Sequence, residues 1–259
     1  MYEAEISRSN PALILFLFDC SYSMSERYGS TGLTKGQYLT RLCNESIDQV
    51  ILSCEKGDEI RAYFHIGVLG YGDSATALVP IQSVVDLAYH PLRFTRSEID
   101  GIEVKVPMWL EDPTAKVNTD MAAGFRLAKK ALTQWIIQHG GSFPPVLIHV
   151  SDGVWTTENP TGIAKEILSG VCTADGSAIV LNIHISGKDE ETLAFPARLT
   201  AGTEHQLALF AMSSVLPDPF FRRATEIYPF VEVGARGYMF NAQPKDLSKF
   251  FDIGTRLRG

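Results

Sequence analysis

An uninterrupted apolar run from Ala12 to Phe18 is the feature that most constrains the fold of this chain. A strand that is apolar on both faces has to be buried on both faces, as in the centre of a parallel sheet. The run ends directly in Asp19-Cys20-Ser21-Tyr22-Ser23, which places an acid and two hydroxyls at every second position. Such oxygens suit a hard divalent cation, Mg²⁺ or Mn²⁺. Short polar side chains also cap turns and helices, so this stretch alone leaves both interpretations open.

Strand-like and helix-like stretches alternate along most of the chain, which is typical of a parallel sheet covered by helices on both faces. The stretches that favour strands are 12–18, 61–69, 75–85, 145–150, 178–184 and 238–241. Those that favour helices are 33–54, 117 onward, 163–169, 204–215 and 244–257. The strand at 75–85 follows a tight turn and is expected to lie antiparallel at one edge. The sequence therefore predicts an α/β fold with a doubly wound, mostly parallel sheet.

No internal repeat or low-complexity linker interrupts the 259 residues, so we predict a single domain spanning 1–259. Two segments depart from the alternation, at about 89–116 and 186–234, and are expected to be insertions. Aromatic residues within them are expected to be exposed and to extend a partner surface. These residues are Phe94, Trp109 and the pair Phe220-Phe221.

Composition excludes several classes of function. The chain has 23 Lys and Arg against 30 Asp and Glu, a net charge of -7, and lacks a basic cluster, which argues against nucleic acid as a partner. Its first residues are acidic rather than basic, and no apolar run reaches the roughly 18 residues of a membrane helix. We therefore expect a cytoplasmic protein with no membrane partner. The cysteines lack metal-binding or redox spacing and are expected to be reduced core residues; they are Cys20, Cys43, Cys54 and Cys172.

The separate oxygen-bearing residues are expected to meet at one edge of the sheet. In a doubly wound sheet the ligand site lies beyond the carboxyl ends of the strands. Asp19 follows one expected strand, Asp152 follows another, and Thr119 opens the helix between them, where Asn118 or Thr119 would be the helix cap. Together with Ser21 and Ser23, these residues would offer two carboxylates and three hydroxyls to a single divalent cation. The predicted metal site is Asp19, Ser21, Ser23, Thr119 and Asp152.

At these positions the sequence resembles the von Willebrand factor type A (vWA) family. The metal-ion-dependent adhesion site (MIDAS) of that family has Asp-x-Ser-x-Ser after the first strand, a Thr opening a later helix, and Asp-Gly after the fourth strand. Here those elements are the segment 19–23, Thr119 and Asp152-Gly153. The resemblance covers most of residues 12–185 and the final strand and helix. It implies a Rossmann-like sheet of about six strands with one antiparallel edge strand, and a magnesium whose last coordination position accepts a carboxylate from a partner protein.

The balance of hydroxyls and acids would decide what such a site does. If Ser21, Ser23 and Thr119 contact the ion directly while the two acids act through waters, little negative charge lies in the inner shell. The cation then attracts an outside Glu or Asp strongly, because Coulomb attraction in a partly dry crevice is less screened than in water. The expected function is therefore metal-dependent protein–protein interaction.

The sequence also departs from the family pattern. Tyr22 stands where the family usually has a small residue, and Val117-Asn118 stand where it has Gly or Ser; Tyr22 is expected to face a partner. Asp120 and Asp73 are expected to be a helix acid and a turn acid. Histidines within the apolar strands are expected to be structural; they are His65, His149 and His184.

An enzyme is the alternative class. A metal-dependent phosphotransferase or phosphatase with Asp19 as nucleophile generally has a second acid two residues later, but Ser21 stands there. A nuclease would have a denser acid cluster, and no serine-hydrolase elbow or phosphate-binding loop motif occurs. We predict a protein without catalytic activity.

A looser resemblance points to intracellular bacterial vWA proteins of the tellurite-resistance type. It implies work alongside a protein kinase or phosphatase in a stress or signalling assembly. A second possibility is a structural or self-assembling module, in which an acid from a neighbouring copy of the chain occupies the site.

Overall fold

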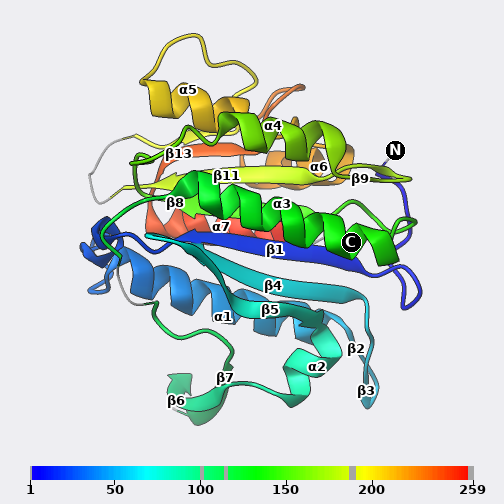
Figure 1. Cartoon of the computed structure of the whole chain (residues 1–259). Coiled ribbons are helices and arrows are strands. Elements are labelled where there is room, and N and C mark those ends of the chain that lie inside the picture. The colour runs from blue at the N-terminus through cyan, green and yellow to red at the C-terminus, as the bar shows by residue number, and fades with distance from the viewer. Residues whose placement is uncertain (1, 100–101, 114–115, 187–190, 256–259) are drawn as a thin grey trace.

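A seven-stranded sheet runs through the middle of the protein, with helices on both faces (Figure 1). The computed structural model describes residues 2–99, 102–113, 116–186 and 191–255. In spatial order the strands are β12 (Leu193–Ala194), β13 (Tyr238–Ala242), β11 (Ile179–Ile185), β8 (Val146–Ser151), β1 (Ala12–Asp19), β4 (Phe64–Tyr71) and β5 (Ala75–Ser83). The five inner strands are parallel, and β5 and β12 are antiparallel to their neighbours. The predicted α/β fold class is confirmed.

The sheet has one strand more than expected. Six strands with one antiparallel edge were predicted, whereas the second edge also ends in an antiparallel strand, β12. This strand has only two residues, Leu193 and Ala194, so it leaves no periodic pattern in the sequence. Very short edge strands are one way in which proteins limit pairing between sheets of different molecules.

The helices form two layers. The long or medium helices are α1 (Lys35–Ser53), α3 (Met121–Gln138), α4 (Thr161–Gly170), α5 (Glu204–Ala211), α6 (Asp218–Ile227) and α7 (Pro244–Thr255). Two short ones are the 3-10 helix η1 (Tyr22–Ser25) and α2 (Val84–Tyr89). Helices α1, α2, α6 and α7 pack on one core, and α3, α4 and α5 pack on the other.

Strand β1 explains why its sequence is apolar throughout. Its alternate residues enter opposite cores: Ile14, Phe16 and Phe18 face α1 and α7, while Leu13, Leu15 and Leu17 face α3. All eight residues of β1 are buried. The carboxyl end of this strand therefore lies at the centre of the sheet and is held from both sides.

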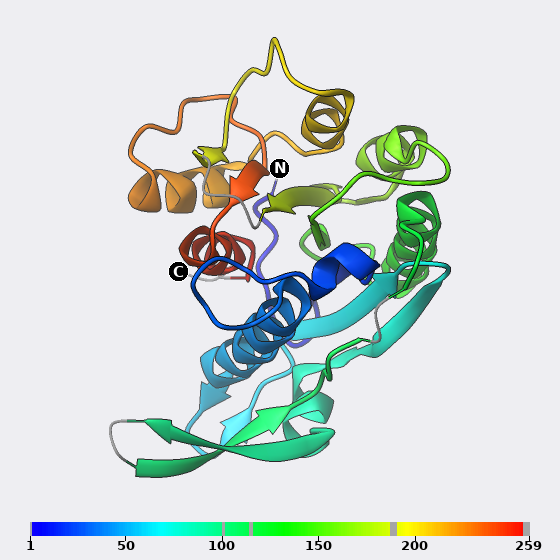
Figure 2. The same ribbon diagram turned by 90° about the vertical axis from the view of Figure 1, so that its left-hand side faces the viewer.

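The segment 89–116 contains a hairpin that extends from the body of the protein, formed by β6 (Arg93–Ile99) and β7 (Ile102–Met108) (Figures 1 and 2). Phe94 on β6 is 60% exposed, as expected. Trp109, just after β7, is buried, so the prediction that it is exposed is wrong. Buried Asn44 of α1 holds this end of the hairpin, because its side-chain oxygen accepts from the backbone N–H groups of Trp109 and Leu110.

The segment 186–234 also differs from its prediction. It contains α6, which begins at Pro217-Asp218-Pro219; proline is tolerated in the first turn of a helix, so this Pro-rich stretch is not irregular. Phe220 on α6 is buried, and the prediction that it is exposed is wrong. Helix α5 ends at Ala211 rather than at residue 215.

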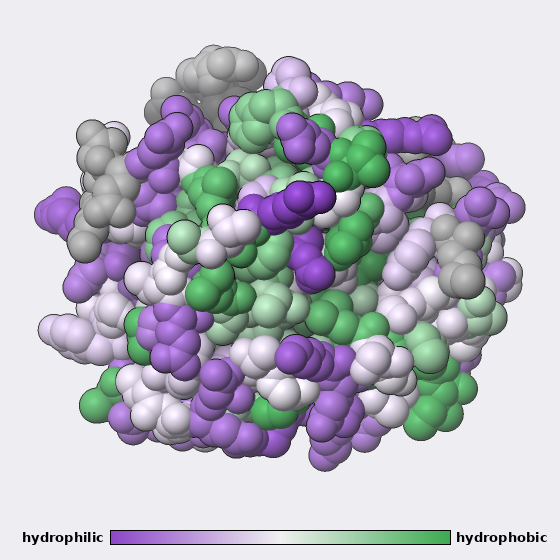
Figure 3. Space-filling model, turned by 90° about the horizontal axis from the view of Figure 1, so that it is seen from above, coloured by the Kyte–Doolittle hydropathy of each residue, from purple (hydrophilic) through white to green (hydrophobic). Residues whose placement is uncertain are grey.

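Figure 3 looks onto the edge of the sheet formed by β12 and β13. Apolar side chains gather near the middle of this face, with polar side chains around them. Partly exposed apolar residues of this region include Leu193, Leu207 and Val215. The helices of the segment 186–234, rather than further strands, cover this edge.

Two further sequence predictions concern cysteines and membrane segments. Cys20, Cys43 and Cys54 are buried, as expected, but Cys172 is exposed. It lies in a small surface hairpin of β9 (Cys172–Thr173) and β10 (Gly176–Ser177), where it contributes nothing to the core. In the described part of the chain, none of the helices combines the length and apolarity that crossing a membrane requires. A second small hairpin, formed by β2 (Glu55–Lys56) and β3 (Glu59–Ile60), directly follows α1.

Candidate metal centre

The candidate centre lies at the carboxyl ends of β1 and β8, the edge of the sheet that faces the viewer in Figure 2. These strands are parallel neighbours, with Phe18 opposite Val150, so the residues that follow each strand meet. Ser151 at the end of β8 donates its hydroxyl proton to Asp19 Oδ2 at 2.9 Å. The strand order therefore brings Asp19 and Asp152, 133 residues apart in the chain, to one place.

Asp19 is a buried carboxylate surrounded by neutral donors. Its Oδ1 accepts from the backbone N–H of Ser21 at 2.8 Å, and its side chain is 1% exposed. Burial raises the pKa of Asp19 to about 6, against hydrogen bonds from Ser21 that lower it, and the charge of Asp152 raises it further. Within the part of the chain that the structure describes, no Lys or Arg pairs with Asp19. A cation beside this carboxylate would relieve an unfavourable buried charge.

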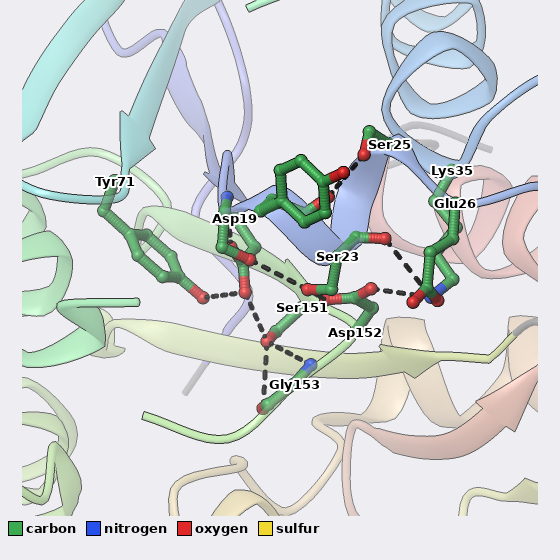
Figure 4. A network of polar contacts seen from close by, with 11 residues as sticks. Asp19, Ser23, Ser25, Glu26, Lys35, Tyr71, Ser151, Asp152 and Gly153 are labelled. Atoms are coloured by element: carbon green, nitrogen blue, oxygen red, sulfur yellow. Dashed lines mark hydrogen bonds and ion pairs between the residues drawn. The ribbon is translucent and has the colours of Figure 1, made fainter. Parts of the chain in front are cut away.

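Ser23 lies between the two acids (Figure 4), and the Ser21 hydroxyl is hydrogen-bonded to it. Ser23 Oγ donates to Asp152 Oδ1 at 2.7 Å. The two Oγ atoms lie 3.0 Å apart. Because Ser23 gives its one proton to Asp152, the Ser21 hydroxyl is the donor in the hydrogen bond between the two serines, and each oxygen still keeps a lone pair for a further partner.

This geometry fits a magnesium-sized ion. Ligands at neighbouring corners of an octahedron with metal–oxygen distances of 2.0–2.1 Å are about 2.9–3.0 Å apart, which matches the Ser21–Ser23 separation of 3.0 Å. The donors are oxygens only, as hard cations prefer. Among the described residues, no three His, Cys, Asp or Glu side chains gather as a metal site by themselves.

Thr119, the fifth predicted residue, is tied by its backbone to Thr156 in the loop that follows β8. Its N–H donates to Thr156 Oγ1 at 3.0 Å, and its carbonyl accepts from the Thr156 N–H at 3.1 Å. The loop before it is tied to the first strand by a hydrogen bond from the Lys116 N–H to the Cys20 carbonyl. Thr119 is buried between the loops that follow β1, β4 and β8. Its part as a metal ligand stays a prediction.

The neighbouring acids have structural tasks, as expected. Asp73 Oδ1 accepts from the N–H and the side-chain amide of Asn118, at 3.0 and 2.9 Å. Asp120 caps α3 by accepting from the Ala123 N–H at 3.0 Å. The prediction that Asn118 or Thr119 is the cap of α3 is wrong. The backbone N–H of Asn118 is bound by Asp73, and that of Thr119 by Thr156, so both residues belong to the loop before the helix.

Tyr22 lies between the two serines and points into solvent, with 72% of its surface exposed. Its backbone carbonyl accepts from Ser25 Oγ at 2.6 Å, which holds the turn of η1. The ring is therefore not packed into the core, and its contact with a partner stays a prediction.

Sequence reasoning missed Lys35, the first residue of α1. Its ammonium lies 2.7 Å from Asp152 Oδ2 and 2.8 Å from Glu26 Oε2 (Figure 4). A cation at the positive, N-terminal end of a helix dipole is unfavourable, and this unusual placement is the feature that could have revealed it. Burial lowers the pKa of Lys35, but hydrogen bonds to Asp152 and Glu26 raise it above its ordinary value.

The three strand histidines are structural, as predicted. His149 is fully buried and bonded to Tyr71 and Asn182, and burial lowers its pKa to about 4. His184 accepts from the Asn241 N–H at 3.3 Å, and burial likewise lowers its pKa to about 4. His65 accepts from the indole N–H of Trp135 at 2.8 Å.

Comparison of the whole fold with known proteins gives a consistent result at low sequence identity. No family model matches the sequence, and no curated protein matches it either. A solved von Willebrand factor type A structure from Catenulispora acidiphila aligns with 96% of this chain and 43% of its own length, at 14% identity and a TM-score of 0.50. The chain has the vWA fold.

Two other solved structures have a similar fold. Proximal thread matrix protein 1 from the mussel byssus matches this vWA fold over 98% of the chain and 47% of its own length, at 13% identity and a TM-score of 0.52. In another solved structure of that mussel protein, zinc occupies its MIDAS motif. An aerotolerance-related membrane protein from Bacteroides fragilis matches over 95% of the chain and all of its own length, at 11% identity and a TM-score of 0.50. The chain spans about half the length of the mussel and Catenulispora proteins.

Proposed function

We propose that this vWA-fold protein is a metal-dependent protein-interaction module. In this proposal Ser21, Ser23 and Thr119 bind a divalent cation directly, and Asp19 and Asp152 stabilise it through waters. The observation that carries the proposal is the pair of serine oxygens, 3.0 Å apart, in a hydrogen-bonded row that links Asp19 to Asp152 and leaves a lone pair on each oxygen. The zinc found in the MIDAS motif of a protein with the same fold supports it.

The partner group in this proposal is a carboxylate of Glu or Asp. Both oxygens of Asp152 are engaged, by Ser23 and Lys35, and the oxygens of Asp19 accept from Ser21 and Ser151. An ion held mainly by neutral hydroxyls keeps most of its positive charge, so an external carboxylate would bind it strongly in this partly buried setting. Tyr22 would then pack against the partner next to the bound acid.

The proposal does not include catalysis. A nucleophilic Asp19 would need an accessible oxygen, whereas this side chain is 1% exposed and accepts hydrogen bonds at both oxygens. A phosphatase or nuclease using Asp19 would turn over a generic phosphate ester in the presence of magnesium, and Asp19→Asn would abolish that turnover. We expect no turnover by the wild type or by Asp19→Asn.

The first test is metal binding itself. Calorimetric titration with Mg²⁺, Mn²⁺ and Zn²⁺ should give one site in the wild type. The double substitution Ser21→Ala with Ser23→Ala should weaken binding by about tenfold or more, as loss of metal-site groups commonly does. Ser25→Ala is the matched control, because Ser25 lies in the same 3-10 helix but donates only to the Tyr22 carbonyl. The absence of wild-type binding at millimolar metal would overturn the proposal.

The second test is partner capture. A protein retained from native lysate by the wild type should be released by EDTA and should return when magnesium is restored. Thr119→Ala and Asp152→Ala should both prevent its capture, whereas Ser25→Ala should not. If EDTA and both substitutions leave capture unchanged, the partner binds outside the candidate metal centre. That the protein acts in the cytoplasm, beside a kinase or phosphatase in a bacterial stress or signalling assembly, stays a prediction.

A further inference from the structure

Lys35 occupies a position that is electrostatically unfavourable on two counts. Its side chain is only 5% exposed, and loss of water disfavours a charged ammonium. It is also the first residue of α1, after the cap Thr34, where the helix dipole repels a cation. Its two carboxylate partners, Asp152 and Glu26, offset these costs, and the ammonium also donates to the Ser23 carbonyl at 3.5 Å.

The ammonium is held firmly against the candidate metal centre. Asp152, whose side chain is fully buried, gives one oxygen to Lys35 and the other to Ser23. The backbone N–H of Lys35 donates to the Glu26 carbonyl at 2.9 Å, which fixes the start of α1 to the turn after η1. The exposed Glu26 carboxylate completes the ion pair from the solvent side. Lys35 therefore lies next to the carboxylate that follows β8, and the fold gives it little freedom to leave.

This ammonium changes the charge of the centre. Asp19 and Asp152 carry two negative charges, of which Lys35 neutralises one. A divalent cation would then leave the buried centre with one net positive charge, and a carboxylate from outside would neutralise it. With no lysine present, the metal alone would balance the two acids. Glu26 counts for less, because its side chain is 66% exposed and screened by water.

We propose that Lys35 makes metal binding and carboxylate binding depend on each other. This inference rests on the proposed function. Lys35 lowers the affinity of the centre for the metal alone and raises the affinity of the metal-loaded centre for an acid, so each ligand strengthens the other by the same factor. Lys35 is a positioning residue in this scheme, since it acts through Asp152 and through its charge. The protein would hold its metal tightly only while a partner's carboxylate is bound.

The test measures Mn²⁺ affinity by calorimetry, in acetate and in chloride at equal ionic strength, with acetate standing in for the partner's acid. In the wild type, saturating acetate should strengthen Mn²⁺ binding by about tenfold, within the usual range of coupling between two ligands. Lys35→Met should bind Mn²⁺ about tenfold more tightly in chloride, and acetate should add little. Lys35→Arg keeps the charge and should restore the acetate effect. Lys129→Met is the matched control, because it breaks a surface ion pair with Glu166 away from the centre and should behave as wild type.

The outcomes separate this inference from the proposed function. If wild type and Lys35→Met bind Mn²⁺ equally well and respond equally to acetate, the role of Lys35 is refuted while the metal site stands. If Lys35→Met binds Mn²⁺ more weakly, Lys35 only supports Asp152, and the inference is again refuted. If neither chain binds Mn²⁺ in either buffer, both proposals fail. Should Lys35→Met not fold, the wild-type comparison decides alone, since equal affinity in acetate and chloride would overturn the inference.

Discussion

Tyr71 and His149 share a hydrogen bond of 2.8 Å between the phenol oxygen and Nε2, directly beneath Asp19. Which of the two groups donates the proton follows from the hydrogen bonds of Asn182, the other partner of His149. The Asn182 amide nitrogen donates to Ser213 Oγ at 3.0 Å, so the Asn182 oxygen is an acceptor and receives the Nδ1 proton of His149. Nε2 of His149 then has only a lone pair, so Tyr71 donates its proton to it at 2.8 Å, and the contact of the phenol oxygen with Asp19 Oδ2, at 3.4 Å, is the weaker of the two. Burial raises the pKa of Tyr71 well above its usual value, which keeps the phenol protonated for this task.

Tyr71→Phe should destabilise the protein. It leaves the buried Nε2 of His149 without a donor, and an unsatisfied buried acceptor costs about 1–3 kcal/mol. The measurement is urea unfolding at pH 7 in EDTA. Tyr89→Phe removes a hydroxyl from a ring that is 69% exposed and should change stability little. Equal effects of the two substitutions would contradict the hydrogen-bond direction given above.

The stability contributed by His149 should disappear in acid. Its pKa is about 4 in the folded protein and 6.5 in the unfolded chain, so the unfolded state binds its proton first as the pH falls. The contribution is complete above pH 6.5 and is lost between pH 6.5 and 4, up to about 3 kcal/mol. The raised pKa of Asp19 acts in the opposite sense over nearly the same range, so the wild-type curve alone does not isolate His149.

Comparison of the wild type with His149→Asn isolates the contribution of His149 to stability. The variant should be less stable than the wild type at pH 7, and the difference should shrink as the pH falls from 6.5 to 4, because the variant has no imidazole to protonate. His90→Asn, at an exposed histidine, is the control and should change stability little. A constant difference for His149→Asn, followed by chemical unfolding at each pH, would show that this imidazole is not held neutral.

The sequence predicts the centre of this fold well because the central strands are buried on both faces. Strand β1 and its neighbours leave continuous apolar runs, and the residues that follow them include four of the five predicted site residues in one hydrogen-bonded cluster. Parallel pairing of β1 with β8 is enough to bring Asp19 to Asp152.

Features that depend on distant contacts could not be predicted in the same way. A lysine in the first turn of a helix is an unusual placement that singles out Lys35, but its partner Asp152 is 117 residues away, so the sequence does not show what it pairs with. The sequence around Trp109 lacks the hydrophobic periodicity that marks the core helices and strands. Trp109 is buried because Asn44 of α1 holds this end of the hairpin against the body of the protein. Strand β12 has only two residues, too few for a sequence pattern, and it forms by pairing with the exposed edge of β13.

Gly124 on α3 should resist substitution. A Cβ atom there would lie 2.6 Å from the ring of Tyr71, so Gly124→Ala forces the ring, and with it the bond to His149, to move. We expect a loss of about 1–3 kcal/mol, as for other overpacked sites, together with weaker Mn²⁺ binding. Gly162→Ala on α4 meets no atom within 4 Å and should be neutral or stabilising by up to about 1 kcal/mol. Thermal unfolding and calorimetry of the two variants test this contrast.

The two aromatic residues that flank the hairpin should have separable effects. Trp109 is buried and donates its indole N–H to the Leu87 carbonyl at 2.7 Å, so Trp109→Ala should destabilise the fold by about 3–5 kcal/mol. Phe94→Ser alters a ring that is 60% exposed and should change stability by less than about 0.5 kcal/mol. Only Phe94→Ser therefore tests the hairpin as partner surface. It should weaken partner capture while Mn²⁺ affinity is unchanged, whereas undiminished capture by this stable variant would exclude Phe94 from the contact.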